Sequence, residues 1–172
     1  MRPELTYTAL INQPPGRVAA TLAPLASLEQ EIVLAVDERV DPSWVDGYRQ
    51  LADRVLLVPY PGSFERLYGW LHEQCRGRWI LHLAADEVPS SALAAEVAET
   101  IGAEDVTHAW VPRRWLYPDG GSYLAQWPWR PDHQLRLFRN ESSLVRFPAR
   151  LHEPVGVVGA RRFLRTPIYH TP

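Results

Sequence analysis

The chain has 172 residues, of which 46% are hydrophobic and 22% charged, so it is long enough to form one globular domain with a full core. Its formal net charge of -2 argues against nucleic acid as a partner, because neutralising phosphates requires clustered cations. Cys75 is the single cysteine, which excludes an internal disulfide and a cysteine-based zinc site and fits a reducing cytoplasm. The sequence has no run of about 20 apolar residues, so we expect no transmembrane segment.

Apolar runs typical of strands alternate with helical patterns in the first part of the chain. The runs TYTALIN, EIVLAVD, RVLLVPY and WILHLAAD predict strands over 6–12, 31–37, 54–60 and 79–86. Helical spacing of apolar residues predicts helices over 16–28, after 41, after 63, and from 90 or 91 to 102. This alternation indicates an α/β fold with a mostly parallel sheet flanked by helices.

Several residues mark the ends of these helices. Asp41, followed by a proline at the first helical position, is expected to cap the second helix. Pro24 is expected to bend or shorten the first helix. Serines that can cap the later helices stand at 63, 90 and 91, and Gly102 is expected to end the fourth helix.

Two acids stand at the predicted carboxyl ends of strands. Asp37 ends the second strand and Asp86 the fourth. Ligands of open α/β sheets bind beyond the carboxyl ends of the strands, so we expect both acids on one rim, near a ligand. The structural alternative is that each acid only caps the turn or helix that follows it.

Prolines and tryptophans become frequent after residue 106. Alternating patterns predict strands over 106–118 and 134–140, with a tight turn at 119–121. Trp110, Trp115, Trp127 and Trp129 lie in or between these strands. Aromatic faces stack on the apolar faces of sugar rings, which favours a carbohydrate surface, whereas packing in the core explains each tryptophan equally well.

The order of these elements, together with four stretches, resembles the sugar-nucleotide half of family 2 glycosyltransferases with the GT-A fold. The stretches are IVLAVDERVD, ERLYGWLHEQCRGRWILHLAADEVPS, DHQLRLFRN and RFPARLHEPV, which span most of the chain from residue 31 onward. The resemblance implies a single GT-A-like domain over 1–172, with a nucleotide-sugar half at 1–105 and an acceptor-side half at 106–172. It also implies a nucleoside-diphosphate sugar as donor and a carbohydrate, lipid-linked or small-molecule acceptor.

The resemblance assigns roles to residues at the donor side. Asp37 corresponds to the aspartate that contacts the nucleoside base or its surroundings, and Arg66 to the arginine near the nucleotide. In the family the fourth strand ends in an Asp-x-Asp pattern, whose second aspartate ligates a divalent metal and whose first supports the ribose or a metal-bound water. Asp86 keeps the metal position here, next to Ala85, and Ala84 replaces the first acid. A manganese or magnesium ion at Asp86 would stabilise the anionic diphosphate as it leaves.

The stretch RLHEPV supplies candidates for the acceptor side. An inverting transfer needs a base on the far side of the sugar from the metal, and Glu153 is the first candidate for it, with Asp132 as the alternative. His152 is a candidate ligand for the metal or a phosphate, and Arg136 or Arg139 a candidate to neutralise the diphosphate. The structural alternative is an ordinary hydrogen-bonded His-Glu pair and arginines that face water.

The sequence therefore favours an inverting, metal-dependent glycosyltransferase in the cytoplasm. Ala84 keeps open a degenerate GT-A domain that binds nucleotide or sugar without catalysis. A sugar-phosphate nucleotidyltransferase is disfavoured, because only Gly16 stands where those enzymes carry a glycine-rich phosphate loop. A plain protein-interaction module would not need acids at two strand ends.

Overall fold

The computed structural model of the chain describes residues 2–147 and 155–171. Four strands of its first half run parallel to one another. They are β1 (Leu5–Ile11), β2 (Gln30–Asp37), β3 (Arg54–Val58) and β4 (Trp79–His82). These strands lie close to the predicted ranges, except that β4 ends before the predicted end of its strand.

The second half extends the same sheet. Its strands are β5 (Glu87–Pro89), β6 (His108–Trp115), β7 (His133–Arg139), β10 (Arg161–Phe163) and β11 (Ile168–His170). Within the described residues the sheet has the order β3-β2-β1-β4-β7-β6-β11-β5, and β10 also pairs with β6. The strand β7 is antiparallel to both β4 and β6, so β6 runs parallel to β4. A separate two-stranded antiparallel sheet pairs β8 (Val145–Arg146) with β9 (Gly156–Val157).

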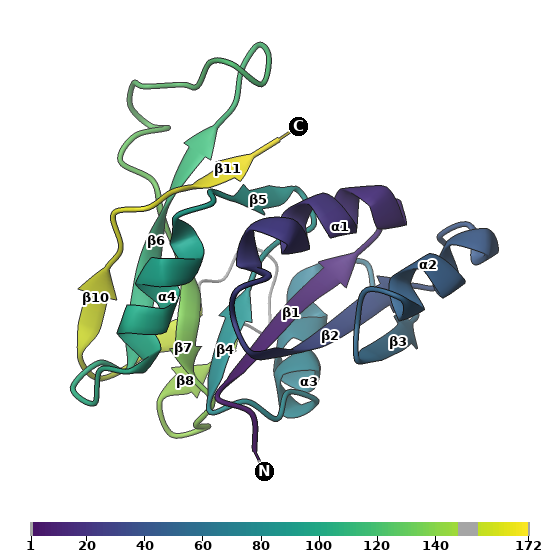
Figure 1. Ribbon diagram of the computed structural model, residues 1–172, viewed down its shortest axis with the longest axis horizontal. Coiled ribbons are helices and arrows are strands. Elements are labelled where there is room, and N and C mark those ends of the chain that lie inside the picture. Colours follow the sequence, from purple (N-terminus) through teal and green to yellow (C-terminus); the bar gives the residue numbers. More distant parts are fainter. Residues whose placement is uncertain (1, 148–154, 172) are drawn as a thin grey trace.

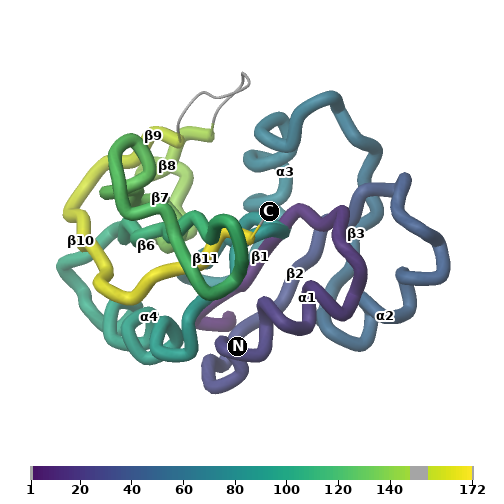
Figure 2. Tube along the Cα trace, turned by 90° about the horizontal axis from the view of Figure 1, so that it is seen from above, coloured from purple at the N-terminus to yellow at the C-terminus, as the bar shows by residue number. Residues whose placement is uncertain are grey.

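Helices cover both faces of the sheet. Figures 1 and 2 show α1 (Pro15–Leu22), α2 (Val45–Arg49) and α4 (Leu93–Ile101) on one face and α3 (Tyr68–Glu73) on the other. Side chains alternate along β2 accordingly, with Leu34 and Val36 in the core beneath α1 and α4, and Val33 and Ala35 in the core beneath α3. The predicted α/β class with a mostly parallel sheet flanked by helices is confirmed.

The predicted helix signals have mixed outcomes. The helix α1 ends at Leu22 and a 3-10 turn over Ala23–Leu25 follows, as expected from Pro24. Asp41 caps a 3-10 turn, Pro42–Trp44, that leads into α2, because its Oδ1 accepts from the Ser43 amide. The serine predictions are correct only for the position of Ser63. Ser63 is the N-cap residue of the 3-10 turn Phe64–Leu67 before α3, but its hydroxyl donates to Glu65 Oε2 and makes no capping bond. The N-cap of α4 is Ala92, so the prediction of Ser90 or Ser91 is wrong.

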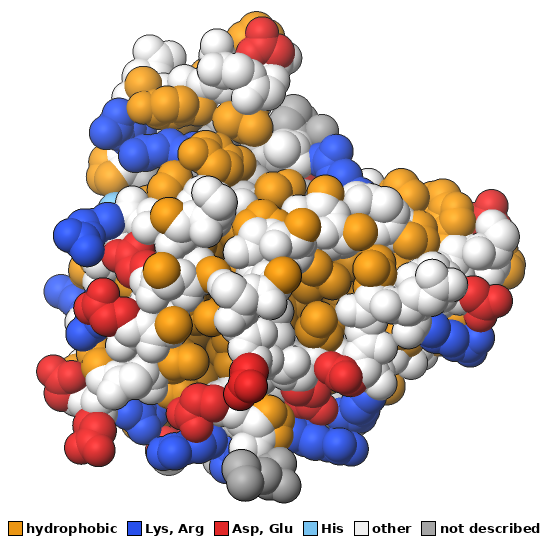
Figure 3. Space-filling view, viewed as in Figure 1, with side chains coloured by type: hydrophobic (Ala, Val, Ile, Leu, Met, Phe, Trp, Pro, Cys, Tyr) orange, Lys and Arg blue, Asp and Glu red, His pale blue; other side chains and the backbone are white. Residues whose placement is uncertain are grey.

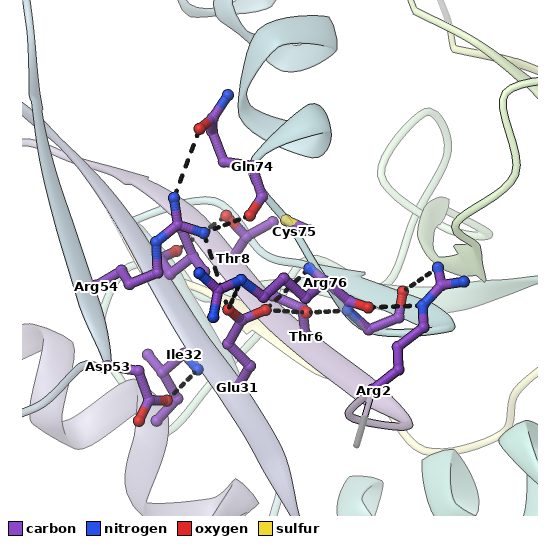
Figure 4. Close-up of polar contacts among 12 residues, drawn as sticks. Arg2, Thr6, Thr8, Glu31, Ile32, Asp53, Arg54, Gln74, Cys75 and Arg76 are labelled. Carbon is purple, nitrogen blue, oxygen red and sulfur yellow. Dashed lines mark hydrogen bonds and ion pairs between the residues drawn. The ribbon is translucent and has the colours of Figure 1, made fainter.

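A buried carboxylate joins the amino ends of three strands. Glu31 at the start of β2 accepts from the Thr6 hydroxyl at 2.8 Å and the Arg76 amide at 2.9 Å, and Gly77 N donates to the same hydroxyl at 2.8 Å (Figure 4). The guanidinium groups of Arg54 and Arg76 lie 3.8 Å from Glu31 Oε1. An open pocket of about 850 Å³ lies beside this network, at the amino ends of the strands. Ligands of α/β sheets bind at the opposite, carboxyl ends.

None of the described helices combines the length and the apolar character needed to cross a membrane.

Candidate functional site

Two adjoining pockets lie at the carboxyl edge of the parallel strands. The first has about 180 Å³ and the second about 390 Å³, and Asn12, which follows β1, lines both. Asp86 lines the first pocket together with Ala84 and Ala85, and Asp37 lines the second. The two acids therefore lie on the same rim of the sheet, as their positions after β2 and β4 predict. The two pockets share Asn12 over the ends of β1, β2 and β4, and we refer to the pair as the groove.

Asp37 is buried and ionised. Its side chain is 3% exposed, and Arg39 donates to it through Nε at 2.9 Å to Oδ1 and through Nη2 at 2.6 Å to Oδ2. The Arg39 hydrogen bond lowers the pKa of Asp37 despite the burial of the carboxyl group. The Arg39 guanidinium also lies over the Tyr60 ring, 4.1 Å from its centroid. Asp37 thus fixes the loop after β2 and places a cation at the rim of the second pocket.

Asp86 lies in a tight turn that begins where β4 ends. The predicted strand over 79–86 is too long, because the Glu87 carboxylate folds back and accepts from the Ala84 amide at 3.0 Å. The Glu87 amide donates to Ala84 O at 3.1 Å, and β5 starts at Glu87. Asp86 remains half exposed, in the wall of the first pocket. The turn separates the two acids, with Asp86 facing the pocket and Glu87 facing the interior.

Glu87 and Arg136 form a buried ion pair. Arg136 donates to Glu87 through Nε at 2.7 Å and Nη2 at 2.6 Å, and Arg113 adds a contact at 3.3 Å. Burial raises the pKa of Glu87, but its pairing with Arg136 outweighs that effect and lowers the pKa below its usual value. The contacts of Arg136 thus give it a structural role behind the turn, and its expected role at a diphosphate stays a prediction.

Arg139 lies at the other edge of the sheet. It stands opposite Trp79 at the start of β4, and its guanidinium donates to Val106 O and Glu104 O. The expectation that Arg139 neutralises a diphosphate at the carboxyl edge is therefore wrong. Arg66 lies in the 3-10 turn before α3 and donates to Pro61 O at 3.2 Å.

His170 is the neighbour of Asp86 that the sequence did not indicate. Its Nε2 lies 3.1 Å from Asp86 Oδ2, and β11 holds it there by pairing with β5 and β6. Thr171 strengthens the contact, since its amide donates to Asp86 O at 2.9 Å. The only signal was the short run PIYH, which is too brief for its alternation to be informative.

Asp132 is connected to this pair through Trp115. Its carboxylate accepts from Arg113 Nε at 2.8 Å, Trp115 Nε1 at 2.7 Å and Gln134 Nε2 at 2.6 Å. Burial raises its pKa, but these three donors outweigh the effect and lower it. The Trp115 ring lies on the His170 ring with centroids 4.0 Å apart. Asp132 therefore positions Trp115, and a carboxylate with three donors has a weakened capacity to accept a further proton.

His152 and Glu153 lie outside the described residues, so their expected roles stay predictions. In the described part of the chain no three side chains of His, Cys, Asp or Glu form a group that could hold a metal ion. Asp86 and His170 contact each other at 3.1 Å and would supply a carboxylate oxygen and an imidazole nitrogen to an ion bound between them. This set fits a manganese or magnesium ion that takes its remaining ligands from phosphate oxygens and water.

No protein-family model matches the chain, and no curated protein matches its sequence. Solved structures do match. The crystal structure of S. aureus TarS 1-349 has a TM-score of 0.70 at 14% identity, over 98% of this chain and 60% of that one. TarS 1-349 in complex with UDP-GlcNAc matches with a TM-score of 0.61 at 14% identity, over 80% of this chain and 45% of that one. Its complex with UDP gives a TM-score of 0.56 at 14% identity, over 80% and 47%.

These matches confirm the GT-A glycosyltransferase fold predicted from the sequence. At 14% identity the likeness extends to the fold alone, and the chain spans 60% of the length of the first of these structures.

Proposed function

We propose that the chain transfers a sugar from a nucleoside-diphosphate donor bound at the carboxyl edge of the sheet. The observation that carries the proposal is the groove around Asn12, which has Asp37 at one end and Asp86 at the other, in a GT-A fold. The TarS complexes with UDP-GlcNAc and UDP support this class of donor. The pocket with Asp37 would hold the nucleoside, and the pocket with Asp86 the diphosphate and sugar.

A divalent metal is part of the proposal. Asp86 and His170, which lie 3.1 Å apart, would hold manganese or magnesium, with His152 as a further candidate ligand. When bound, the ion would supply positive charge against the diphosphate that leaves. Ala84 stands where the family pattern has an acid before Asp86. Donor phosphates and water must therefore supply more of the ligands of the metal ion.

The proposed transfer inverts the anomeric carbon. The acceptor hydroxyl oxygen bonds to that carbon, the bond to the diphosphate oxygen breaks, and the hydroxyl proton passes to a base. Glu153 is the candidate base. The contacts of Asp132 with three donors make it the weaker candidate, because they stabilise its ionised form. The cytoplasm as location, and the division into a donor half (1–105) and an acceptor half (106–172), belong to the same proposal.

A domain that binds the donor without catalysis is the second candidate. Two observations favour it. Ala84 stands where the family pattern has its first acid, and the Asp132 carboxylate already accepts hydrogen bonds from three donors. Both the glycosyltransferase and the non-catalytic domain bind the donor, but only the glycosyltransferase turns it over.

The Glu153→Gln variant separates them. Glutamine keeps the size of the side chain and removes its capacity to accept a proton, so donor binding should persist while transfer or donor hydrolysis falls by roughly 10²- to 10⁴-fold. Binding is measured by calorimetric titration, and turnover by release of nucleoside diphosphate from a panel of sugar nucleotides with manganese.

Asp132→Asn is the matched control. If it abolishes turnover without loss of stability while Glu153→Gln stays active, Asp132 is the base. If the parent chain binds donor and turns over none of the panel, the non-catalytic domain is correct.

A further inference from the structure

The connection between β6 and β7 exposes an unusual number of aromatic side chains. This aromatic loop, residues 116–131, projects from the body of the molecule beyond the end of β6 (Figure 1). Trp127 is 83% exposed, Tyr117 62%, Tyr123 42% and Trp129 37%. Single exposed aromatics are common, but a group of this kind on one loop marks an interaction surface.

Hydrogen bonds hold the aromatic loop in shape. Leu116 and Tyr123 pair as an antiparallel bridge, and Tyr117 N donates to Ser122 O at 3.1 Å. Leu124 N donates to Trp115 O at 2.9 Å, which ties the returning chain to the end of β6. The aromatic side chains are thus presented to solvent by a folded segment.

Cations accompany these aromatics. Arg114 lies over the Tyr123 ring, 5.1 Å from its centroid, and Arg130 Nη1 lies 3.4 Å from the Tyr123 hydroxyl. Residues 116–131 contain one arginine, Arg130, and one acid, Asp119, and Arg114 on β6 adds a second cation beside the loop. Figure 3 shows hydrophobic side chains along this projection, basic side chains near its base and an acidic side chain at its end. Tryptophan and tyrosine prefer the boundary between lipid headgroups and chains, and arginine binds anionic headgroups.

We propose that the aromatic loop docks the protein on an anionic lipid bilayer. A projecting surface suits a flat partner, whereas a free saccharide needs a groove, and none of the pockets described above is lined by the four exposed aromatics. Each tryptophan that leaves water at the headgroup boundary favours docking, and each arginine near anionic lipid adds electrostatic attraction.

The loop is joined to the candidate site by direct ring contacts. Trp129 packs on Trp115 with centroids 4.9 Å apart, Trp115 lies 4.0 Å from His170, and His170 contacts Asp86. A docked loop therefore brings the donor groove close to the bilayer. The acceptor is then one carried by a lipid, a conclusion that rests on the proposed function, whereas docking itself does not.

Co-sedimentation with vesicles tests the proposal. The parent chain should bind vesicles of phosphatidylcholine with phosphatidylglycerol and bind phosphatidylcholine alone more weakly. Trp127→Ala should weaken binding by at least about tenfold, because it removes a large interfacial side chain. Arg130→Gln should weaken binding to the anionic vesicles by about fivefold. Trp70→Ala is the control, since Trp70 is 38% exposed on α3 and should leave binding unchanged.

Titration with a nucleoside diphosphate, without vesicles, separates this proposal from the proposed function. Nucleotide binding without vesicle binding overturns docking and leaves the donor site intact. Vesicle binding without nucleotide binding supports docking and removes the lipid-borne acceptor. A third outcome is that the parent does not bind vesicles but binds a soluble oligosaccharide, and that Trp127→Ala abolishes this binding. The loop is then a saccharide site and the proposal is wrong.

Discussion

Two buried histidines lie next to each other beside the first pocket, which His82 lines and His72 does not. The rings of His72 on α3 and His82 at the end of β4 have centroids 5.2 Å apart, and His72 stacks on Phe147 at 4.2 Å. Both ring nitrogens of His72 and Nδ1 of His82 have no hydrogen-bond partner among the described residues. Burial lowers the pKa of both rings, that of His82 to about 3 and that of His72 well below its usual value. Both are therefore neutral at pH 7.

These histidines make the fold sensitive to acid. Below about pH 6.5 both histidines bind a proton in the unfolded chain, whereas in the folded chain they stay neutral because their pKa values are lowered. The free energy of unfolding therefore falls as the pH falls. For His82, whose folded pKa is about 3, the loss between pH 7 and pH 5 amounts to about 2 kcal/mol.

His72→Phe tests this effect away from the pockets that contain Asp37 and Asp86. Phenylalanine keeps the stacking on Phe147 and removes two unpartnered nitrogens, so the variant should be as stable as the parent at pH 7 or more stable. It should also lose less stability between pH 7 and pH 5. Urea unfolding at both pH values measures the loss of stability in the parent and the variant. The control is His133→Gln, because the His133 side chain is partly exposed. An equal loss in the parent and His72→Phe contradicts the prediction.

At the scale of elements, Gly77 controls how β4 enters the sheet. A Cβ atom at Gly77 would lie 2.4 Å from Thr6 N and 2.7 Å from Trp79 O, both of them backbone atoms that cannot give way alone. We expect Gly77→Ala to destabilise the protein by about 1–3 kcal/mol or more, because it forces β1 and β4 apart.

Gly102 is the matched control for Gly77. It ends α4 with a helical φ of -76°, and the nearest atoms to an added Cβ lie at 3.6 Å. Gly102→Ala should therefore raise the free energy of unfolding slightly, by about 0.4–1 kcal/mol. Thermal unfolding of both variants checks the pair. Equal melting temperatures would show that β1 and β4 can adjust at Gly77.

Elements with a long periodic pattern were predictable from the sequence. The runs that became β1, β2 and β4 are buried on both faces, so their continuous apolar character identified them. The run that became β3 has the same apolar character, although β3 is an edge strand on which Leu57 is 53% exposed. The end of β4 was not predictable, because the turn at Ala84 depends on Glu87, and Glu87 is held by Arg136 from a distant strand. The serines near helix starts were misleading, since local hydrogen bonds other than caps satisfied Ser63.

The candidate site was predictable in part for the same reason. Asp37 ends β2, and Asp86 follows β4 in the same parallel sheet, so their shared rim could be inferred from topology. His170 belongs to a three-residue strand that exists only through pairing with β5 and β6, and local pattern carries no such information. The roles of Asp132 and Arg136 depended on partners that only the folded chain brings together.

At the scale of the whole molecule, one sheet joins the two halves expected from the sequence. The first half supplies Asp37 and Asp86, and the second half supplies His170 and the Trp115 ring behind it. The proposed donor site is therefore built from residues of both halves. A nucleotide that binds here should stabilise the entire sheet, because both halves contribute to its site.

The most direct test of the proposed donor site is a calorimetric titration of the chain with a panel of nucleoside diphosphates, with and without manganese. We expect at least one of them to bind, with manganese tightening the binding. Asp86→Ala should abolish the manganese effect and keep the weaker metal-free binding, while Asp46→Ala, which removes an acid that is 83% exposed on α2, should change neither. No binding of any nucleoside diphosphate, or an unchanged manganese effect in Asp86→Ala, would contradict the account.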